Sequence, residues 1–353
     1  MVVIPARMPV PKTIASITIA VASAFASVNV ACAQGNATVS QGHIDAATAT
    51  AGTDLIGWLR LCRPAPLPSQ EHRPGMTSEK PNPLAALLGE KVAAEPMKVF
   101  DNLYFLGTKW VTAWAVTTSD GIILIDALNN DEEAERVITG GFRKLGLDPA
   151  QIKYLVISHA HGDHYGGAGH IVEKHKPRVV MSEIDWRELE KPVLQFDNAF
   201  FGRPPKRDMA VADGHKLQLG DTTVELYLTP GHTPGTIATV FTVKDGSTSH
   251  RAMLWGGTAF NFGKIAPQMR SFVASADRMG GLAAREKVDV ILANHVSYDA
   301  GLERMARLAV RKLDEAHPYV IGTENVARAI KVIGECARGF LTSFDSELEP
   351  ARK

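Results

Sequence analysis

Short apolar runs separated by polar turns dominate the chain from Met97 onward. Asp101-Asn102 and Ser119-Asp120-Gly121 have the composition of tight turns between such runs. The first predicted strands span residues 98–100, 103–107, 111–118 and 121–126. Strands this short at this spacing predict an antiparallel meander.

The pattern then changes to an alternation of helices and strands. A helix is predicted over residues 131–145, followed by a buried strand at 154–157. Residues 197–214 are polar and contain Pro204-Pro205, so they are expected to form a loop. Further helices are predicted at 168–175, 183–190, 271–286, 302–317 and 324–341, and further strands at 178–181, 216–219, 223–228, 236–243, 251–256 and 288–293. Two β-rich halves, each followed by helices, predict an α/β (α+β) fold in which helices cover two packed sheets.

Residues 34–95 lack this regular pattern and are rich in Ala, Pro and Gly. Prolines recur from Pro64 to Pro83 and interrupt any long periodic segment. We therefore expect an irregular N-terminal extension with at most short helices, at 54–61 and 83–88. The chain then divides into this extension, a main folded domain at 96–343 and a tail at 344–353.

The first 33 residues resemble a secretory signal peptide. Arg7 and Lys12 precede an apolar stretch that ends in Ala31-Cys32-Ala33, a small-x-small cleavage pattern. We expect cleavage near Ala33, a periplasmic or secreted protein, and no membrane span in the mature chain. A membrane anchor, or a lipid on Cys32, is the alternative.

Charge and cysteine content narrow the function classes. The 353 residues carry 38 basic and 38 acidic side chains, and this balance disfavours nucleic acid as a partner. A small-molecule substrate remains compatible with it. Loss of residues 1–33 would remove two positive charges and leave 36 basic against 38 acidic residues. Cys62 and Cys336 would remain, either as a disulfide or as two thiols.

One short segment carries the strongest chemical signal. His159, His161, Asp163 and His164 fall within six residues at the exit of the apolar strand 154–157. A single histidine is ordinarily a surface or core residue, but three imidazoles and a carboxylate this close favour a metal site. Two more histidines, His232 and His295, each follow a predicted strand, so they are expected on rigid supports near the same site.

These motifs resemble the metallo-β-lactamase fold superfamily. The HxHxDH block, the turn Thr229-Pro230-Gly231-His232-Thr233-Pro234-Gly235 and the late histidine carry the resemblance, which covers residues 96–343. It implies a four-layer αββα sandwich and a zinc hydrolase with two ions per chain. It also implies two ligand sets, which are His159, His161 and His232 for the first ion and Asp163, His164 and His295 for the second.

The branch of the superfamily depends on the segment around Gly257. Lactonases and glyoxalase II of this superfamily place a metal-bridging aspartate there, whereas this chain reads Trp255-Gly256-Gly257-Thr258. A second site without that carboxylate resembles subclass B3 metallo-β-lactamases. Their serine-rich segment for the substrate carboxylate is absent, which leaves Thr258 and Asn261 as candidate substrate contacts.

The resemblance also implies a mechanism. A zinc-bound hydroxide would open the β-lactam amide, with Asp163 as the catalytic residue that orients it. Asp126, at the end of strand 121–126, is either a support for a ligand imidazole or an ordinary turn residue. The alternatives are a zinc hydrolase of the same fold acting on another ester, lactone or thioester, and a binding protein with a degenerate site.

Overall fold

The first half of the chain forms a seven-stranded sheet. The computed structural model describes residues 37–63, 93–194, 199–312 and 314–345, so the signal segment and the helix expected at 83–88 lie outside it. The strands follow chain order and are β1 (Met97–Phe100), β2 (Leu103–Phe105), β3 (Trp114–Thr118), β4 (Gly121–Ile125), β5 (Ile152–Val156), β6 (Arg178–Ser182) and β7 (Met209–Val211). Strands β1 to β4 pair antiparallel, which confirms the predicted meander, and β4 to β7 pair parallel. The short edge strand β7 falls where a loop was predicted.

The second half forms a five-stranded sheet in the order β12-β11-β10-β9-β8. Its strands are β8 (His215–Leu219), β9 (Thr222–Leu228), β10 (Ile237–Asp245), β11 (Thr248–Trp255) and β12 (Val290–Ala293). Only β12 pairs parallel, with β11 beside it. Chain reversals after β8, β9 and β10 therefore make a second meander.

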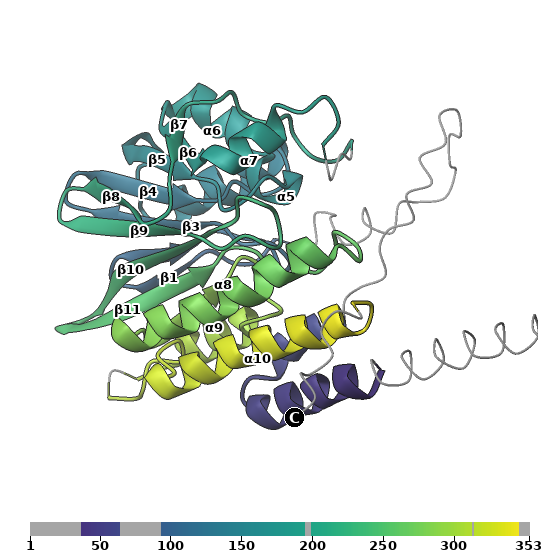
Figure 1. Ribbon diagram of the computed structural model, residues 1–353. Coiled ribbons are helices and arrows are strands. Elements are labelled where there is room, and N and C mark those ends of the chain that lie inside the picture. The colour runs from purple at the N-terminus through teal and green to yellow at the C-terminus, as the bar shows by residue number, and fades with distance from the viewer. Residues whose placement is uncertain (1–36, 64–92, 195–198, 313, 346–353) are drawn as a thin grey trace, which may run out of the picture.

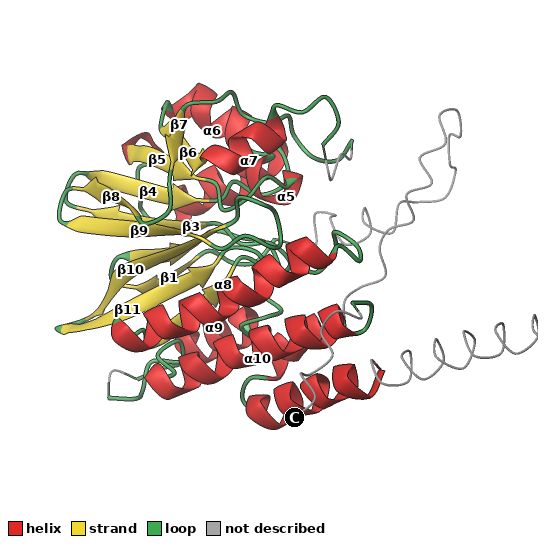
Figure 2. Ribbon diagram, viewed as in Figure 1, coloured by secondary structure: helices red, strands yellow, loops and turns green. Residues whose placement is uncertain are grey.

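Helices cover the outer faces of the pair of sheets (Figures 1 and 2). On the first sheet they are α3 (Asp131–Glu133), the π-helix η3 (Ala134–Thr139), α4 (Gly140–Lys144), α5 (Gly162–Tyr165), α6 (Ala168–His175) and α7 (Glu183–Leu189), with the 3-10 turn η4 (Pro149–Gln151) before β5. On the side of the second sheet they are α8 (Ala266–Arg285), α9 (Gly301–Ala309) and α10 (Thr323–Thr342). In the described residues no helix is both long and apolar enough to span a membrane.

Side-chain alternation along the strands builds the layers. In β4, Ile122 and Leu124 pack with the outer helices, whereas Ile123 and Ile125 point between the two sheets. In β11, Leu254 joins the layer between the sheets and Trp255 packs toward α8 and α10. Three apolar layers therefore separate four structural layers, and the predicted αββα sandwich is confirmed.

The N-terminal extension differs from its prediction. Residues 37–51 form a helix, and η1 (Ile56–Cys62) is a 3-10 helix. Both bury apolar side chains, among them Ala51 and Trp58, in the cluster that includes α10. A disulfide joins Cys62 to Cys336 with an S–S distance of 2.00 Å, which decides between the two predicted alternatives. η1 confirms the short helix predicted at 54–61, whereas the helix at 37–51 was not predicted. The prolines that suggested an irregular extension lie between Pro64 and Pro83, outside the described residues.

The helix predicted at 302–317 is also shorter than expected. It ends at Ala309, and Val310 is exposed. His317 instead returns to the core, where its ring stacks on Phe100 at a centroid distance of 4.1 Å. Tertiary packing of this turn therefore takes precedence over helix propensity.

Candidate metal centre

Three loops at the ends of buried strands carry the predicted site residues. The loop after β5 holds His159 and His161 and leads into α5, which holds Asp163 and His164. The loops after β9 and β12 hold His232 and His295. Strands β5 and β12 belong to different sheets, so the cluster lies where the two sheets meet. The structure brings all six side chains together.

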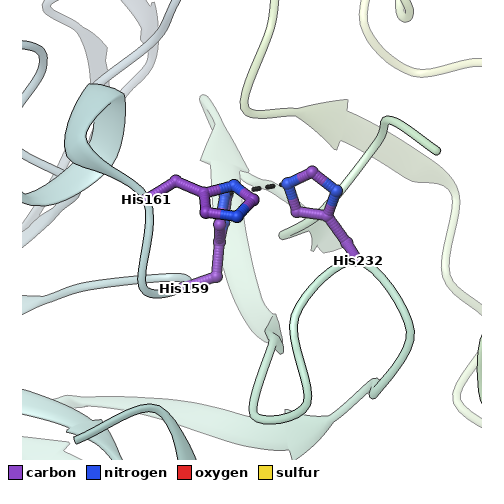
Figure 3. Close-up of side chains that lie close together, drawn as sticks. All are labelled: His159, His161 and His232. Carbon is purple, nitrogen blue, oxygen red and sulfur yellow. Dashed lines mark hydrogen bonds between the residues drawn. The ribbon is translucent and has the colours of Figure 1, made fainter. Parts of the chain in front are cut away.

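A three-histidine group forms the first part of the cluster (Figure 3). Nitrogen atoms of His159, His161 and His232 all lie within 4.8 Å of one another. The Nε2 atoms of His159 and His232 are 3.0 Å apart. All three side chains are nearly inaccessible to solvent.

The second part of the cluster is centred on Asp163. One of its carboxylate oxygens lies 3.3 Å from His164 Nε2 and 3.5 Å from His295 Nε2. Ligand atoms of His159, Asp163 and His164 also lie within 4.8 Å of one another. Asp163 thus sits between the two histidines that were predicted to share a second ion with it.

The tautomers of two histidines follow from their partners. His232 Nδ1 lies 2.7 Å from the carbonyl oxygen of Ala259, which can only accept, so this nitrogen carries the proton. The Ser158 hydroxyl donates its single proton to Asp126 at 2.9 Å. It can therefore only accept from His159 Nδ1, which lies 3.0 Å from Ser158 Oγ and carries the proton of that hydrogen bond. In the neutral rings both Nε2 atoms are then lone-pair donors facing each other at 3.0 Å. A cation between them would convert this repulsion into coordination, so the donor set fits a metal ion.

Electrostatics favour the same protonation states. Burial, together with the neighbouring imidazoles, lowers the pKa of His159 and of His161 well below the usual value. Burial likewise lowers the pKa of His232 to about 4 and that of His295 to about 3. These rings are therefore neutral at pH 7 and can act as ligands.

Asp163 and His164 form the charged part of the site. Burial opposes both charges, but the His164 and His295 rings hold the pKa of Asp163 far below its usual range. For His164, the carboxylates of Asp163 and Asp126 outweigh burial and raise the pKa to about 10. A bound metal cation could take the place of that proton between the carboxylate and the ring.

Asp126 supports the cluster from behind. Its Oδ1 accepts the backbone N–H of Ser158 at 2.7 Å, and its Oδ2 lies 2.9 Å from His164 Nδ1. It has a left-handed backbone with φ of 63°, which is strained for a residue other than glycine. Of the two interpretations offered by the sequence, these contacts favour the support for a ligand imidazole.

Asp185 is a supporting residue that the sequence did not reveal. Its carboxylate accepts hydrogen bonds from Ala160 N, Gly235 N and Thr233 Oγ1 at 2.6–2.9 Å. Burial outweighs these bonds and raises its pKa to about 6. This one side chain therefore ties the loop after β5 to the loop after β9, which lie far apart in the chain.

The segment after β11 shows why a carboxylate is absent there. A Cβ atom on Gly257 would lie 2.6 Å from His232 Cβ, so a side chain at this position would displace His232. Thr258 is buried, and its hydroxyl donates to Asn294 Oδ1 at 3.3 Å. Asn261 is partly exposed.

The sandwich and its histidine-rich cluster at strand ends make the chain similar to hydrolases of the metallo-β-lactamase superfamily. Residues 110–248 match the family model described as Metallo-beta-lactamase superfamily. This match confirms the resemblance that the sequence motifs carry.

Solved structures extend the likeness beyond the matched segment. BJP-1, a subclass B3 metallo-β-lactamase of Bradyrhizobium japonicum, is 27% identical with a TM-score of 0.58, over 68% of this chain and 90% of BJP-1. Native FEZ-1 of Legionella gormanii is 22% identical with a TM-score of 0.59, over 72% of this chain and 97% of FEZ-1. It shares the fold.

Curated relatives match a shorter stretch. The N-acyl homoserine lactonase AttM of Agrobacterium fabrum is 33% identical over 109 residues, which is 26% of this chain and 37% of the lactonase. A hydroxyacylglutathione hydrolase of Rhodopseudomonas palustris is 30% identical over 109 residues, or 31% and 34% of the two chains. The chain therefore spans about a third of the length of these relatives.

Proposed function

We propose that this protein is a dinuclear zinc hydrolase of the subclass B3 type that opens the β-lactam amide. The observation that carries the proposal is the combination of a three-histidine group with an Asp-His-His group and no carboxylate at Gly257. The likeness to BJP-1 over 90% of that enzyme supports it. The superfamily resemblance associates lactonases and glyoxalase II with an aspartate at this position, where His232 leaves no room for one.

In this proposal, His159, His161 and His232 hold the first zinc, and Asp163, His164 and His295 hold the second. Imidazole and carboxylate are ordinary zinc ligands. Bound zinc supplies Lewis acidity, which lowers the pKa of a coordinated water to about 7 and polarises the scissile carbonyl.

The residues of the chain supply orientation. The Asp163 carboxylate is ionised at neutral pH and can accept a hydrogen bond from the attacking water, which orients the lone pair of that water toward the carbonyl carbon. Asp126 and Ser158 fix the rings of His164 and His159 through their Nδ1 atoms. Ligand positions are thereby set before substrate arrives.

Two substrate contacts were expected next to this cluster. Asn261 is partly exposed, so its amide can donate to the substrate carboxylate. Thr258 is buried against Asn294 and acts by supporting that loop. Substrate recognition in this proposal therefore rests more on Asn261 than on Thr258.

A direct test compares four substrates on zinc-loaded and chelated protein. A chromogenic cephalosporin should be hydrolysed only by the zinc-loaded protein, and faster than an acyl homoserine lactone, an acylglutathione thioester or an aryl ester. Metal analysis should give two zinc ions per chain. Turnover of the lactone or thioester without the cephalosporin would support the second candidate function, which the names of the curated relatives favour.

Export to the periplasm or medium belongs to the same proposal. The Cys62–Cys336 disulfide fits an oxidising compartment. Mass spectrometry of the protein from the periplasmic fraction should find a mature N-terminus near residue 34, and expression should raise the resistance of a host to cephalosporins. An intact leader in the cytoplasmic fraction would contradict export.

A further inference from the structure

The N-terminal segment 37–62, here called the strap, packs along α10 (Figure 1). Its buried face is apolar and belongs to the cluster formed with α8 and α10. The members of this face are Ala47, Ala51, Leu55, Trp58 and Leu61. The strap is thus part of the folded core.

Polar contacts and one covalent bond fix the strap along its whole length. Ser40 Oγ donates to the Gly339 carbonyl at 2.6 Å, and both terminal nitrogens of Arg328 bond Asp54 at 2.9 Å. The disulfide from Cys62 closes the far end. The strap therefore has little freedom to shift relative to α10.

The far end of the strap touches the loop after β12, which carries His295. A Cβ atom on Gly57 would lie 2.4 Å from the Tyr298 carbonyl oxygen and 2.9 Å from that of Ser297. These distances mean that the two backbones are in direct contact and that only glycine fits here.

Tyr298 continues this contact toward the cluster. Its ring centroid lies 6.2 Å from that of Trp58 and 6.4 Å from that of His295. Its backbone N–H donates to the His295 carbonyl at 3.2 Å. Trp58, Tyr298 and His295 therefore form a continuous row from the strap to the site.

We propose that the strap is a positioning element for the second metal position, in which Gly57 and Trp58 hold the His295–Tyr298 loop in its ligating geometry. This inference rests on the proposed metal site. The proposed ligands of the first ion lie in the loops after β5 and β9. The row of Trp58, Tyr298 and His295 that begins at the strap does not include a residue of those loops. The strap should thus affect the second ion and spare the first.

The test is a cobalt titration of the mature protein, with its disulfide verified by thiol counting. Wild type should bind two Co²⁺ ions, each read from its visible absorption. Gly57→Ala should leave the first dissociation constant within about 2-fold and raise the second about 10- to 100-fold, as for the loss of other residues that orient ligands. Gly42→Ala is the matched control, because Gly42 lies on the strap with nothing within 4 Å of an added Cβ.

If Gly57→Ala does not fold, two substitutions of Trp58 test the same proposal. Trp58→Leu leaves space beside Tyr298 and should weaken the second Co²⁺ alone, whereas Trp58→Phe should restore most of the affinity. The double variant Cys62→Ser/Cys336→Ser releases the end of the strap and should act in the same direction.

The outcomes separate this inference from the proposed function. Two wild-type-like affinities in folded Gly57→Ala and Trp58→Leu would overturn the role of the strap and leave the zinc site standing. Equal weakening of both ions would also overturn it. Failure of the wild type to bind two ions would refute the dinuclear site itself.

Discussion

At the residue scale, the site depends on histidine side chains whose Nδ1 atoms already have hydrogen-bond partners. The Nδ1 atoms of His159, His164 and His232 all face oxygen partners, which leaves each Nε2 atom for the centre of the cluster. Partners of this kind fix both the tautomer and the orientation of a ligand ring. Single substitutions should therefore separate binding of the metal from folding of the chain.

Substitution of His164 tests the second ligand set. His164→Ala should reduce bound zinc from two ions to one and lower kcat/KM for the cephalosporin by at least about 100-fold. His175→Ala, at the C-terminal end of α6 and outside both ligand sets, should retain both ions. Plasma emission spectroscopy gives the zinc content per chain, and initial rates give kcat/KM. Full activity in a His164→Ala protein with a single ion would contradict the assignment.

Gly257 tests the distinction between the two candidate substrate classes. Gly257→Asp introduces the carboxylate of the lactonase pattern, but its Cβ would meet His232 Cβ at 2.6 Å. We expect loss of the first ion and no gain of lactonase activity. Gly280→Ala is the control, since its added Cβ would meet only Ile330 Cγ2 at 3.5 Å. A Gly257→Asp protein with two ions and lactone turnover would show that the site accommodates either pattern.

At the scale of elements, Asp185 at the start of α7 joins two ligand loops and gives a pH-dependent prediction. Its carboxyl pKa is raised by burial to about 6 from 3.8, so the folded state holds this proton more tightly than the unfolded chain. Its contribution to stability is therefore full below about pH 4 and is lost as the pH rises through 6. The unfolding free energy of wild type relative to Asp185→Asn should fall by about 2 kcal/mol between pH 4 and 7.

Urea unfolding of chelated protein measures this difference. Chelation removes the metal from both proteins, so the histidine cluster contributes equally to both and cancels. Asp277→Asn, an exposed carboxyl-to-amide change, should alter stability by less than about 0.5 kcal/mol at either pH. A difference between wild type and Asp185→Asn that stays flat or grows with pH would show that burial does not raise this pKa.

The same scale shows what the sequence could predict. Strands such as β4 and β5 were predicted within a few residues because their apolar runs are bounded by turn residues, and the six-residue histidine motif marked the cluster. The helix at residues 37–51 of the strap was missed because its apolar spacing becomes meaningful only against α10, whereas the short helix predicted at 54–61 is confirmed by η1. Asp185 and Tyr298 were missed for a related reason, since their partners lie up to 50 and 240 residues away in the chain.

At the scale of the whole molecule, charge balance predicts how substrate reaches the site. Without residues 1–33 the chain has 36 basic and 38 acidic residues, so no global positive field would draw the anionic β-lactam of the proposed function toward the cluster. Electrostatic steering would make kcat/KM fall steeply with ionic strength, because salt screens charges beyond about 10 Å at 0.1 M. We expect kcat/KM for an anionic cephalosporin to change less than about 2-fold between 0.05 and 0.5 M ionic strength.

Two controls separate electrostatic steering of the substrate from other effects of salt on kcat/KM. A neutral aryl ester on the same protein reports effects of salt on the enzyme itself, and sodium sulfate beside sodium chloride reports anion binding at the metal. The ratio of the cephalosporin rate to the ester rate should stay constant with either salt. A ratio that falls more than about 10-fold would reveal a local positive potential at the pocket mouth, strong enough to act despite a neutral chain.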